Sequence, residues 1–262
     1  MPIPERHNPT FVSAQSPALL RSVALEEARR RLIVALDAPS ADAATRIADK
    51  LEGACLWFKV GMELFTAEGP AVLEPMLKRG YRIFLDLKFH DIPNTVAGAV
   101  RSAAALGVSM LNVHAAGGLA MLAAARAALD ELPGLADPPQ LLAVTMLTSM
   151  DAAQMSATGL ERSAAEQVAL LARMSMAAGI RGFVCSSLEV AALRELTGSE
   201  GVLVVPGIRP AGAGTSDQRR IATPAEALRQ GASYLVVGRP ITQALDPAEA
   251  ADAILREMAE VL

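Results

Sequence analysis

The chain has 262 residues, enough to bury a substantial core, and more than most single domains contain unless the architecture is a large one such as an α/β barrel. Its 24 Lys and Arg residues stand against 28 Asp and Glu residues, so no basic field favours nucleic acid as a partner. Aromatic residues make up 3% of the sequence and offer few surfaces on which bases could stack. We therefore expect a small-molecule partner.

The N-terminal stretch is rich in proline and shows no sustained hydrophobic period. It predicts a poorly ordered N-terminal tail of residues 1 to 25, followed by one catalytic domain from residue 26 to 262. Residues 1 to 23 lack the continuous apolar run of a signal peptide, and no later segment reaches the length of a membrane span. We expect neither a targeting signal nor a membrane anchor.

The two cysteines, Cys55 and Cys185, are far apart in the sequence. They lack the Cys-X-X-Cys spacing of a zinc site and do not indicate a disulfide framework. A reducing, cytoplasmic location fits this cysteine usage best.

From Arg31 onward, short apolar runs alternate with Ala- and Leu-rich stretches of helical spacing. We expect strands at residues 32–36, 56–60, 83–87, 110–113, 141–147, 182–185, 202–205 and 234–237. We expect helices at residues 41–51, 62–78, 96–106, 118–132, 163–178, 188–196, 224–230 and 247–262. Eight such β-then-α units, with strands that are apolar on both faces, favour a single (β/α)₈ TIM barrel over an open doubly wound sheet.

The third predicted strand leads into the stretch FLDLKFHDIPNTV, residues 84 to 96. Strand alternation places Asp86 and Lys88 on one face, where they would neutralise each other or line a wet cavity. Taken alone, this pair would be an interior salt bridge. Asp91 adds a third charge in the following loop, and Pro93 suits the first turn of a helix. Three charges at the carboxyl end of a buried strand predict an active site.

Other polar residues follow the predicted strands at the same end. In a barrel of this type the active site lies at the carboxyl ends of the strands. The first strand ends in Asp37, the second near Lys59, and the fifth runs into Thr148 and Ser149. We expect all of them to face one mouth.

The last two strand ends favour a phosphate group in the substrate. The seventh strand ends in VVPGIRP and is followed by a Gly-, Ala- and Ser-rich loop, residues 211–216, whose composition is typical of a lid. The eighth ends in Gly238 and Arg239, and loops seven and eight of such barrels commonly hold phosphate. The alternative, that Gly238 is only a turn and Arg239 only a solvated charge, is less favoured once the barrel is assumed.

Two histidines, His90 and His114, follow predicted strands. A lone histidine at a strand end is more often a hydrogen-bonded core residue than a catalytic base. The histidines and carboxylates show no clear metal-ligand spacing, so we predict no metal site.

Taken together, these segments closely resemble orotidine 5'-phosphate decarboxylases of the bacterial type, from about residue 34 to the C-terminus. The motifs that carry the resemblance are IVALD ending at Asp37, FKVG around Lys59, DLKFHDIPNT (86–95), NVHA around His114, LTSM (147–150), PGIRP (206–210), DQRR (217–220) and VGRPIT (237–242). The chain departs from the family pattern in its longer N-terminal tail and in Val205, where Thr commonly precedes PGIRP.

The resemblance implies a homodimer of barrels with shared active sites, no cofactor and no metal. An alternating array would consist of Lys59, Asp86, Lys88 and the partner subunit's Asp91, with Lys88 protonating carbon 6 of the substrate, orotidine 5'-phosphate. The substrate-binding residues that the resemblance implies are Asp37, Lys59, the partner's Thr95 and the partner's Asp91 at the ribose, Thr148 and Ser149 near the pyrimidine, and Gln218, Gly238 and Arg239 at the phosphate, with Arg209 nearby.

The chemistry agrees with this resemblance. Loss of carbon dioxide leaves negative charge on a ring carbon that has no ready electron sink. A fixed ammonium group stabilises that charge as it develops and can then deliver a proton. Asp86 would hold Lys88 charged and crowd the substrate carboxylate, which we rank second to stabilisation of the carbanion.

Two other functions fit parts of the sequence. A sugar-phosphate decarboxylase or aldolase of the related barrel group also has Asp-X-Lys-X-X-Asp but uses magnesium; the complete KFHDIPNT and DQRR strings favour the nucleotide enzyme. A barrel that binds a nucleotide without turning it over is the second alternative, and the presence of every expected charged residue argues against it.

Overall fold

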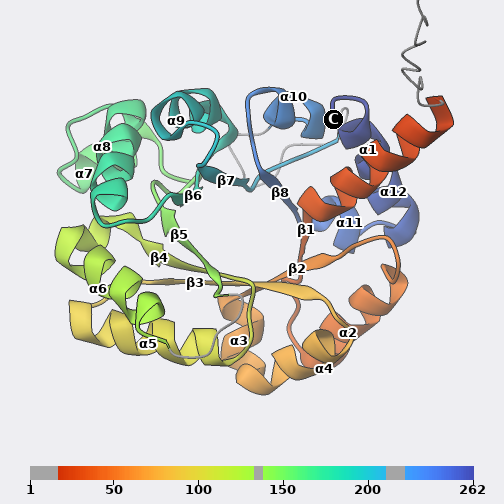
Figure 1. Cartoon of the computed structure of the whole chain (residues 1–262), viewed down its shortest axis with the longest axis horizontal. Coiled ribbons are helices and arrows are strands. Elements are labelled where there is room, and N and C mark those ends of the chain that lie inside the picture. Colours follow the sequence, from red (N-terminus) through yellow and green to blue (C-terminus); the bar gives the residue numbers. More distant parts are fainter. Residues whose placement is uncertain (1–16, 133–137, 211–221) are drawn as a thin grey trace, which may run out of the picture.

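The computed structural model describes residues 17–132, 138–210 and 222–262. In these ranges eight parallel strands close into a barrel in the order β1 to β8, with β8 pairing back onto β1 (Figure 1). The (β/α)₈ TIM barrel predicted from the sequence is confirmed. The strands are β1 (Leu32–Ala35), β2 (Trp57–Gly61), β3 (Arg82–Phe89), β4 (Met110–His114), β5 (Gln140–Val144), β6 (Gly182–Val184), β7 (Val202–Val205) and β8 (Tyr234–Val237).

Helices form the outer layer of the barrel (Figure 1). None in the described ranges is both long and apolar enough to cross a membrane. The α-helices are α1 (Pro17–Arg31), α2 (Ala41–Lys50), α3 (Met62–Glu68), α4 (Glu74–Lys78), α5 (Pro93–Ala105), α6 (Gly118–Asp130), α7 (Ala152–Ala157), α8 (Ala164–Ala177), α9 (Val190–Thr197), α10 (Pro224–Arg229), α11 (Arg239–Thr242) and α12 (Pro247–Ala259), and the 3₁₀ helices are η1 (Pro70–Leu73), η2 (Ala115–Gly117) and η3 (Ser187–Glu189).

The strands have two buried faces because one packs inside the barrel and the other under the helices. Phe84 of β3 belongs to the interior cluster, whereas Ile83 and Leu85 belong to the core between strands and helices. The interior cluster consists of Ile33, Ala35, Trp57, Phe84, Met110, Leu142, Val204 and Val236. It fills the barrel, so a ligand has room only at a mouth.

Two helical segments differ from the sequence prediction. The predicted helix over residues 62–78 is divided into α3, η1 and α4. The division falls at Gly69, whose φ of 67° ends α3, and Pro70, which begins the next turn. Of the predicted N-terminal tail, residues 17–25 lie in α1, and residues 1–16 lie outside the described residues.

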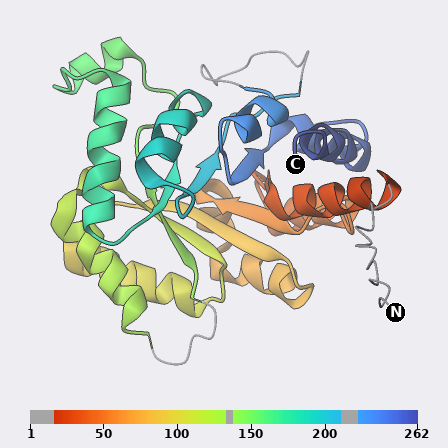
Figure 2. The same cartoon turned by 45° about the horizontal axis from the view of Figure 1, so that its top comes forward.

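Helix α1 is explained by local propensity and by its contact with α12. Its Ala-, Leu-, Glu- and Arg-rich sequence favours a helix, and ion pairs join Glu26 to Arg29 and Glu27 to Arg31. The helix lies beside α12 in both views of the fold, and Ala28 is fully buried (Figures 1 and 2). Because no apolar stripe marks its sequence, a pattern of helical spacing could not reveal it.

Deletion of residues 1–25 should therefore destabilise the barrel. It removes more than half of α1, including Leu25, which packs partly buried against the core. We expect a loss of about 1 kcal/mol or more, and a fall of about 2–4 °C or more in Tm, compared with deletion of residues 1–16 alone. Thermal unfolding of the two truncated proteins measures this difference. Equal Tm values would show that the first half of α1 adds nothing to stability.

Candidate active site

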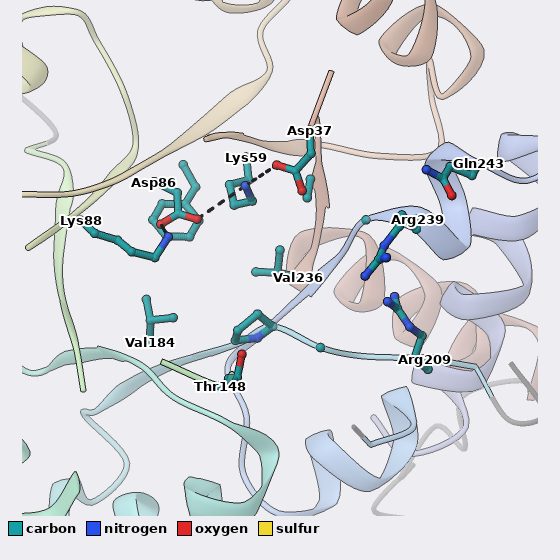
Figure 3. Close-up of a pocket in the computed structure, with 15 residues that line it drawn as sticks. Asp37, Lys59, Asp86, Lys88, Thr148, Val184, Arg209, Val236, Arg239 and Gln243 are labelled. Carbon is teal, nitrogen blue, oxygen red and sulfur yellow. Dashed lines mark hydrogen bonds and ion pairs between the residues drawn. The ribbon is translucent and has the colours of Figure 1, made fainter. Parts of the chain in front are cut away.

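A cavity of about 380 Å³ opens at the carboxyl ends of the strands, a size within the range of small-molecule sites. Apolar side chains from inside the barrel form part of its lining, and charged side chains converge from several strand ends (Figure 3). The residues that line it are Ala35, Asp37, Lys59, Phe84, Asp86, Lys88, Thr148, Val184, Pro206, Gly207, Arg209, Val236, Gly238, Arg239 and Gln243.

Four charged residues form an alternating series along one wall of this cavity (Figure 3). Lys59 Nζ lies 2.8 Å from Asp37 Oδ1 and 3.5 Å from Asp86 Oδ2. Lys88 Nζ lies 2.7 Å from Asp86 Oδ1. The series therefore runs Asp37, Lys59, Asp86, Lys88, within one chain. Asp86 and Lys88, which strand alternation places on one face, both pair with each other and line this cavity.

Asp86 interacts with both lysines of this series and with the side-chain amide of Asn112. Its side chain is 13% exposed, and burial by itself raises the pKa of the carboxyl group. The ammonium groups of Lys59 and Lys88, with hydrogen bonds from Lys88 and from Asn112 Nδ2 at 2.7 Å, outweigh burial and lower the pKa below its usual value. Asp86 is therefore ionised at neutral pH and keeps a fixed negative charge beside Lys88.

Close packing fixes the other end of the series. Gly61 lies at the end of β2, where a Cβ atom would stand 2.9 Å from Lys59 Nζ and 3.3 Å from Asp37 Oδ1. Any larger residue at this position would displace the ammonium group. Glycine here leaves room for the ion pair between Lys59 and Asp37, whose carboxylate is largely exposed at the mouth.

A second group of cations lies away from Lys88 across the cavity (Figure 3). Arg209 follows β7 and is buried, and its backbone N–H donates to the carbonyl of Ala222 at 3.0 Å. Arg239 begins α11 directly after Gly238, and Gln243 follows the same short helix. Two arginines that line one cavity suit an anionic ligand group such as phosphate. The predicted residue Gln218 lies outside the described residues.

Three predicted residues do not line the cavity of this chain. Asp91 is exposed in the loop after β3, where its Oδ1 accepts a hydrogen bond from the N–H of Ile92 at 2.6 Å. Thr95 is exposed in the first turn of α5, and Ser149 is exposed beyond the cavity-lining Thr148. The structure of a single chain brings together the other predicted residues that it describes, but not these three.

The two histidines stack on each other beside the site. Their ring centroids are 5.3 Å apart with an interplanar angle of 16°. His114 Nδ1 accepts a hydrogen bond from the N–H of Ala116, and burial, then His90 and Lys88, lower the pKa of His114. Neither ring lines the cavity. In the described ranges, no three His, Cys, Asp or Glu side chains are grouped so that they could hold a metal ion.

Comparison with known proteins decides the family. Residues 30–254 match the model of the Orotidine 5'-phosphate decarboxylase / HUMPS family. The chain belongs to this family. The orotidine 5'-phosphate decarboxylase of Moorella thermoacetica is 54% identical over 234 residues, 88% of this chain and 93% of the relative. That of Nitrosococcus oceani is 51% identical over 233 residues, 89% of this chain and 99% of the relative.

A solved structure of the orotidine 5'-phosphate decarboxylase family has the same fold. The crystal structure of the enzyme from Lactobacillus acidophilus aligns with a TM-score of 0.77 at 42% identity, covering 87% of this chain and 98% of the other. The resemblance predicted from the sequence motifs is therefore confirmed for family and fold.

Sequence reasoning missed two polar residues of this family member's site. Gln243 lines the cavity one turn after Arg239. Asn112 does not line the cavity itself but donates a hydrogen bond to Asp86 Oδ1. Asn112 had a visible signal, because it is a lone amide in the apolar run Met110–His114 at a position that faces the barrel interior. Gln243 had no comparable signal in the sequence.

Proposed function

We propose that this protein decarboxylates orotidine 5'-phosphate to uridine 5'-phosphate, with Lys88 stabilising and protonating the carbanion at carbon 6. The family match and the relatives of about 50% identity support the reaction. The observation that carries the mechanism is the ion pair of Lys88 with an ionised, buried Asp86 at the wall of the cavity. The product would serve pyrimidine nucleotide synthesis.

The charge pattern of the wall suits this chemistry. When carbon dioxide leaves, negative charge develops on a ring carbon, and an ammonium group held beside that carbon interacts more strongly with the transition state than with the substrate. Asp86 fixes Lys88 Nζ at 2.7 Å before the substrate binds, so little reorganisation is needed. Lys88 then transfers a proton to carbon 6 and closes the reaction.

The two ends of the cavity orient the substrate. We assign the phosphate to Gly238, Arg239, Arg209 and Gln218, and the ribose hydroxyls to Asp37 and Lys59. The pyrimidine then extends toward Lys88, with Thr148 and Ser149 near the ring. Separation of the arginines from Lys88 across one cavity supports this direction (Figure 3). Binding energy from the phosphate end would fix the ring against Lys88 and contribute to the rate.

We further propose a homodimer in which each site receives the partner subunit's Asp91 and the partner's Thr95. Exposed apolar side chains in the segments that follow β2, β3 and β4, which are neighbours in the barrel, support an interface: Met62, Ile92 and Leu119 are 55%, 67% and 50% exposed. Asp91 is beside Ile92 in this region. Burial of such side chains against a second copy would remove apolar surface from water.

The cytoplasm is the compartment that we propose. Both cysteines are buried and free. Burial raises the pKa of the Cys55 thiol to about 12 and raises that of Cys185 as well, so neither is a reactive thiolate. These thiols are compatible with a reducing compartment.

The direct test is an assay of the purified protein with orotidine 5'-phosphate. We expect ultraviolet absorbance to change as the substrate becomes uridine 5'-phosphate, with release of one equivalent of carbon dioxide. Binding of the substrate without turnover would instead favour the alternative of a nucleotide-binding barrel that has no catalytic role.

Excess chelator should leave this activity unchanged. The Lys59 and Lys88 ammonium groups supply the positive charge that a metal ion would otherwise provide. Rates measured with excess EDTA, and again after addition of magnesium, check this expectation. Loss of activity with EDTA and its recovery with magnesium would favour the sugar-phosphate decarboxylase or aldolase.

A further inference from the structure

Asn112 lies in the middle of β4 and is fully buried. Its amide makes two hydrogen bonds of 2.7 Å. The Nδ2 group donates to Asp86 Oδ1, and Oδ1 accepts from the backbone N–H of Lys88. One side chain thus contacts the carboxylate of one charged residue and the backbone of the other.

The backbone that Asn112 contacts is irregular. Leu85 pairs with Leu111, and the next pair joins Phe89 to Val113, so β3 advances four residues while β4 advances two. Within the described residues, Lys88 is the one non-glycine residue with a positive φ, 50°. Side-chain-bearing residues rarely adopt this conformation, because Cβ then crowds the backbone. A bulge of this kind redirects the side chains that follow it.

Asn112 provides the hydrogen-bond acceptor that the Lys88 backbone lacks at the bulge. The register shift takes Lys88 out of the regular ladder, and Asn112 Oδ1 provides the acceptor for its N–H. The Nδ2 group meanwhile donates to the carboxylate oxygen that also accepts from Lys88 Nζ. Asparagine fits both tasks because it has one acceptor and one donor group on a short side chain. Alanine has neither, and an ionised aspartate has no donor.

We propose that Asn112 is a positioning residue for the decarboxylation: it holds the bulge at Lys88 and the orientation of Asp86, and so aims the Lys88 ammonium group into the cavity. This inference rests on the proposed function of the site. Asn112 does not line the cavity, so it acts through Asp86 and Lys88 rather than on the substrate. Replacement of the Asn112 side chain should consequently lower kcat much more than it changes KM.

The test compares Asn112→Ala and Asn112→Asp with wild type. We expect Asn112→Ala to lower kcat about 10- to 100-fold, since a buried charged group loses a donor and a buried N–H loses its acceptor. KM, and the affinity for uridine 5'-phosphate measured by titration, should change by less than about threefold. Ser175→Ala is the matched control: Ser175 is also fully buried and hydrogen-bonded, but it lies in α8. This variant should lose stability without losing kcat.

Asn112→Asp separates positioning from simple loss of packing, because the shape and the acceptor for the Lys88 N–H are retained. The introduced carboxylate would face Asp86 at the distance of a hydrogen bond, so the two share a proton and one pKa is raised. Protonated, the introduced group donates to Asp86 as the amide does. We therefore expect kcat of this variant to fall as pH rises through about 5 to 8, relative to wild type.

Two results would overturn the proposal. The first is a kcat for Asn112→Asp that stays within about twofold of wild type across this pH range. The second is a change in KM, or in the affinity for uridine 5'-phosphate, as large as the change in kcat for Asn112→Ala. If Asn112→Ala does not fold, the pH profile of Asn112→Asp decides alone. Wild-type protein without turnover would instead contradict the proposed function, so the two failures are distinguishable.

Discussion

Replacement of Lys88 by alanine should leave a folded barrel that has almost no decarboxylase activity. The change removes the proton donor and the positive charge that faces the carbanion, so we expect the barrier to rise by at least ~3 kcal/mol. The fold should persist because the Lys88 side chain lies at the mouth, and because Asp86 keeps two other partners, Lys59 and Asn112. Steady-state kinetics with orotidine 5'-phosphate measure the loss.

Lys78→Ala is the matched control for this experiment. Lys78 also pairs with a carboxylate, Glu74, but its side chain is 72% exposed on α4, away from the cavity. Wild-type kinetics are expected for this variant, and unchanged circular dichroism is expected for both variants. If folded Lys88→Ala protein retained near-normal turnover, Lys88 could be neither the proton donor nor the main stabilising charge.

The barrel could be predicted from the sequence because each strand is recognisable from the hydrophobic pattern of its own residues. Each strand is apolar on two faces, so it forms a short run between two helical stretches, and all eight predicted runs overlap the observed strands. Helix α1 carries no such signal. Its stability comes from propensity and from contact with α12 at the far end of the chain, and neither leaves a periodic pattern.

The charged centre of the site was also predictable in part. Alternation along β3 places Phe84, Asp86 and Lys88 on the interior face, and the structure has all three lining the cavity. The bulge at Lys88 was not predictable, because it depends on the register with β4. Asn112 acquires its contacts only through that register, so its position in the sequence could indicate a polar interior residue but not which groups it would hold.

The roles of Asp91 and Thr95 could not be predicted from the pattern of one barrel. Their assignment to the site depends on a second subunit, and a single chain leaves both exposed and outside the cavity. Alternation and strand order act within one barrel and carry no information on contacts between barrels. A test of these residues must therefore use two distinguishable chains.

Lys88→Ala and Asp91→Ala chains, each nearly inactive alone, should restore activity when they are mixed and allowed to exchange. If each site combines Lys88 of one chain with the partner subunit's Asp91, a mixed dimer has one intact site and one site that lacks both residues. Random exchange at equal amounts gives about half mixed dimers, so activity should rise to roughly a quarter of wild type. Native mass spectrometry verifies the mixed dimers, and the decarboxylation rate measures the recovery.

The structure offers a matched control in the pair Lys88→Ala and Asp86→Ala. Asp86 and Lys88 of the same chain are 2.7 Å apart, so every site of that mixed dimer lacks one of the two residues. No recovery is expected, even when mass spectrometry detects as many mixed dimers. Recovery in the Asp91 mixture together with none in the Asp86 mixture would support a shared site. Equal behaviour of the two mixtures, with mixed dimers present in both, would show that Asp91 serves its own chain or does not serve the site.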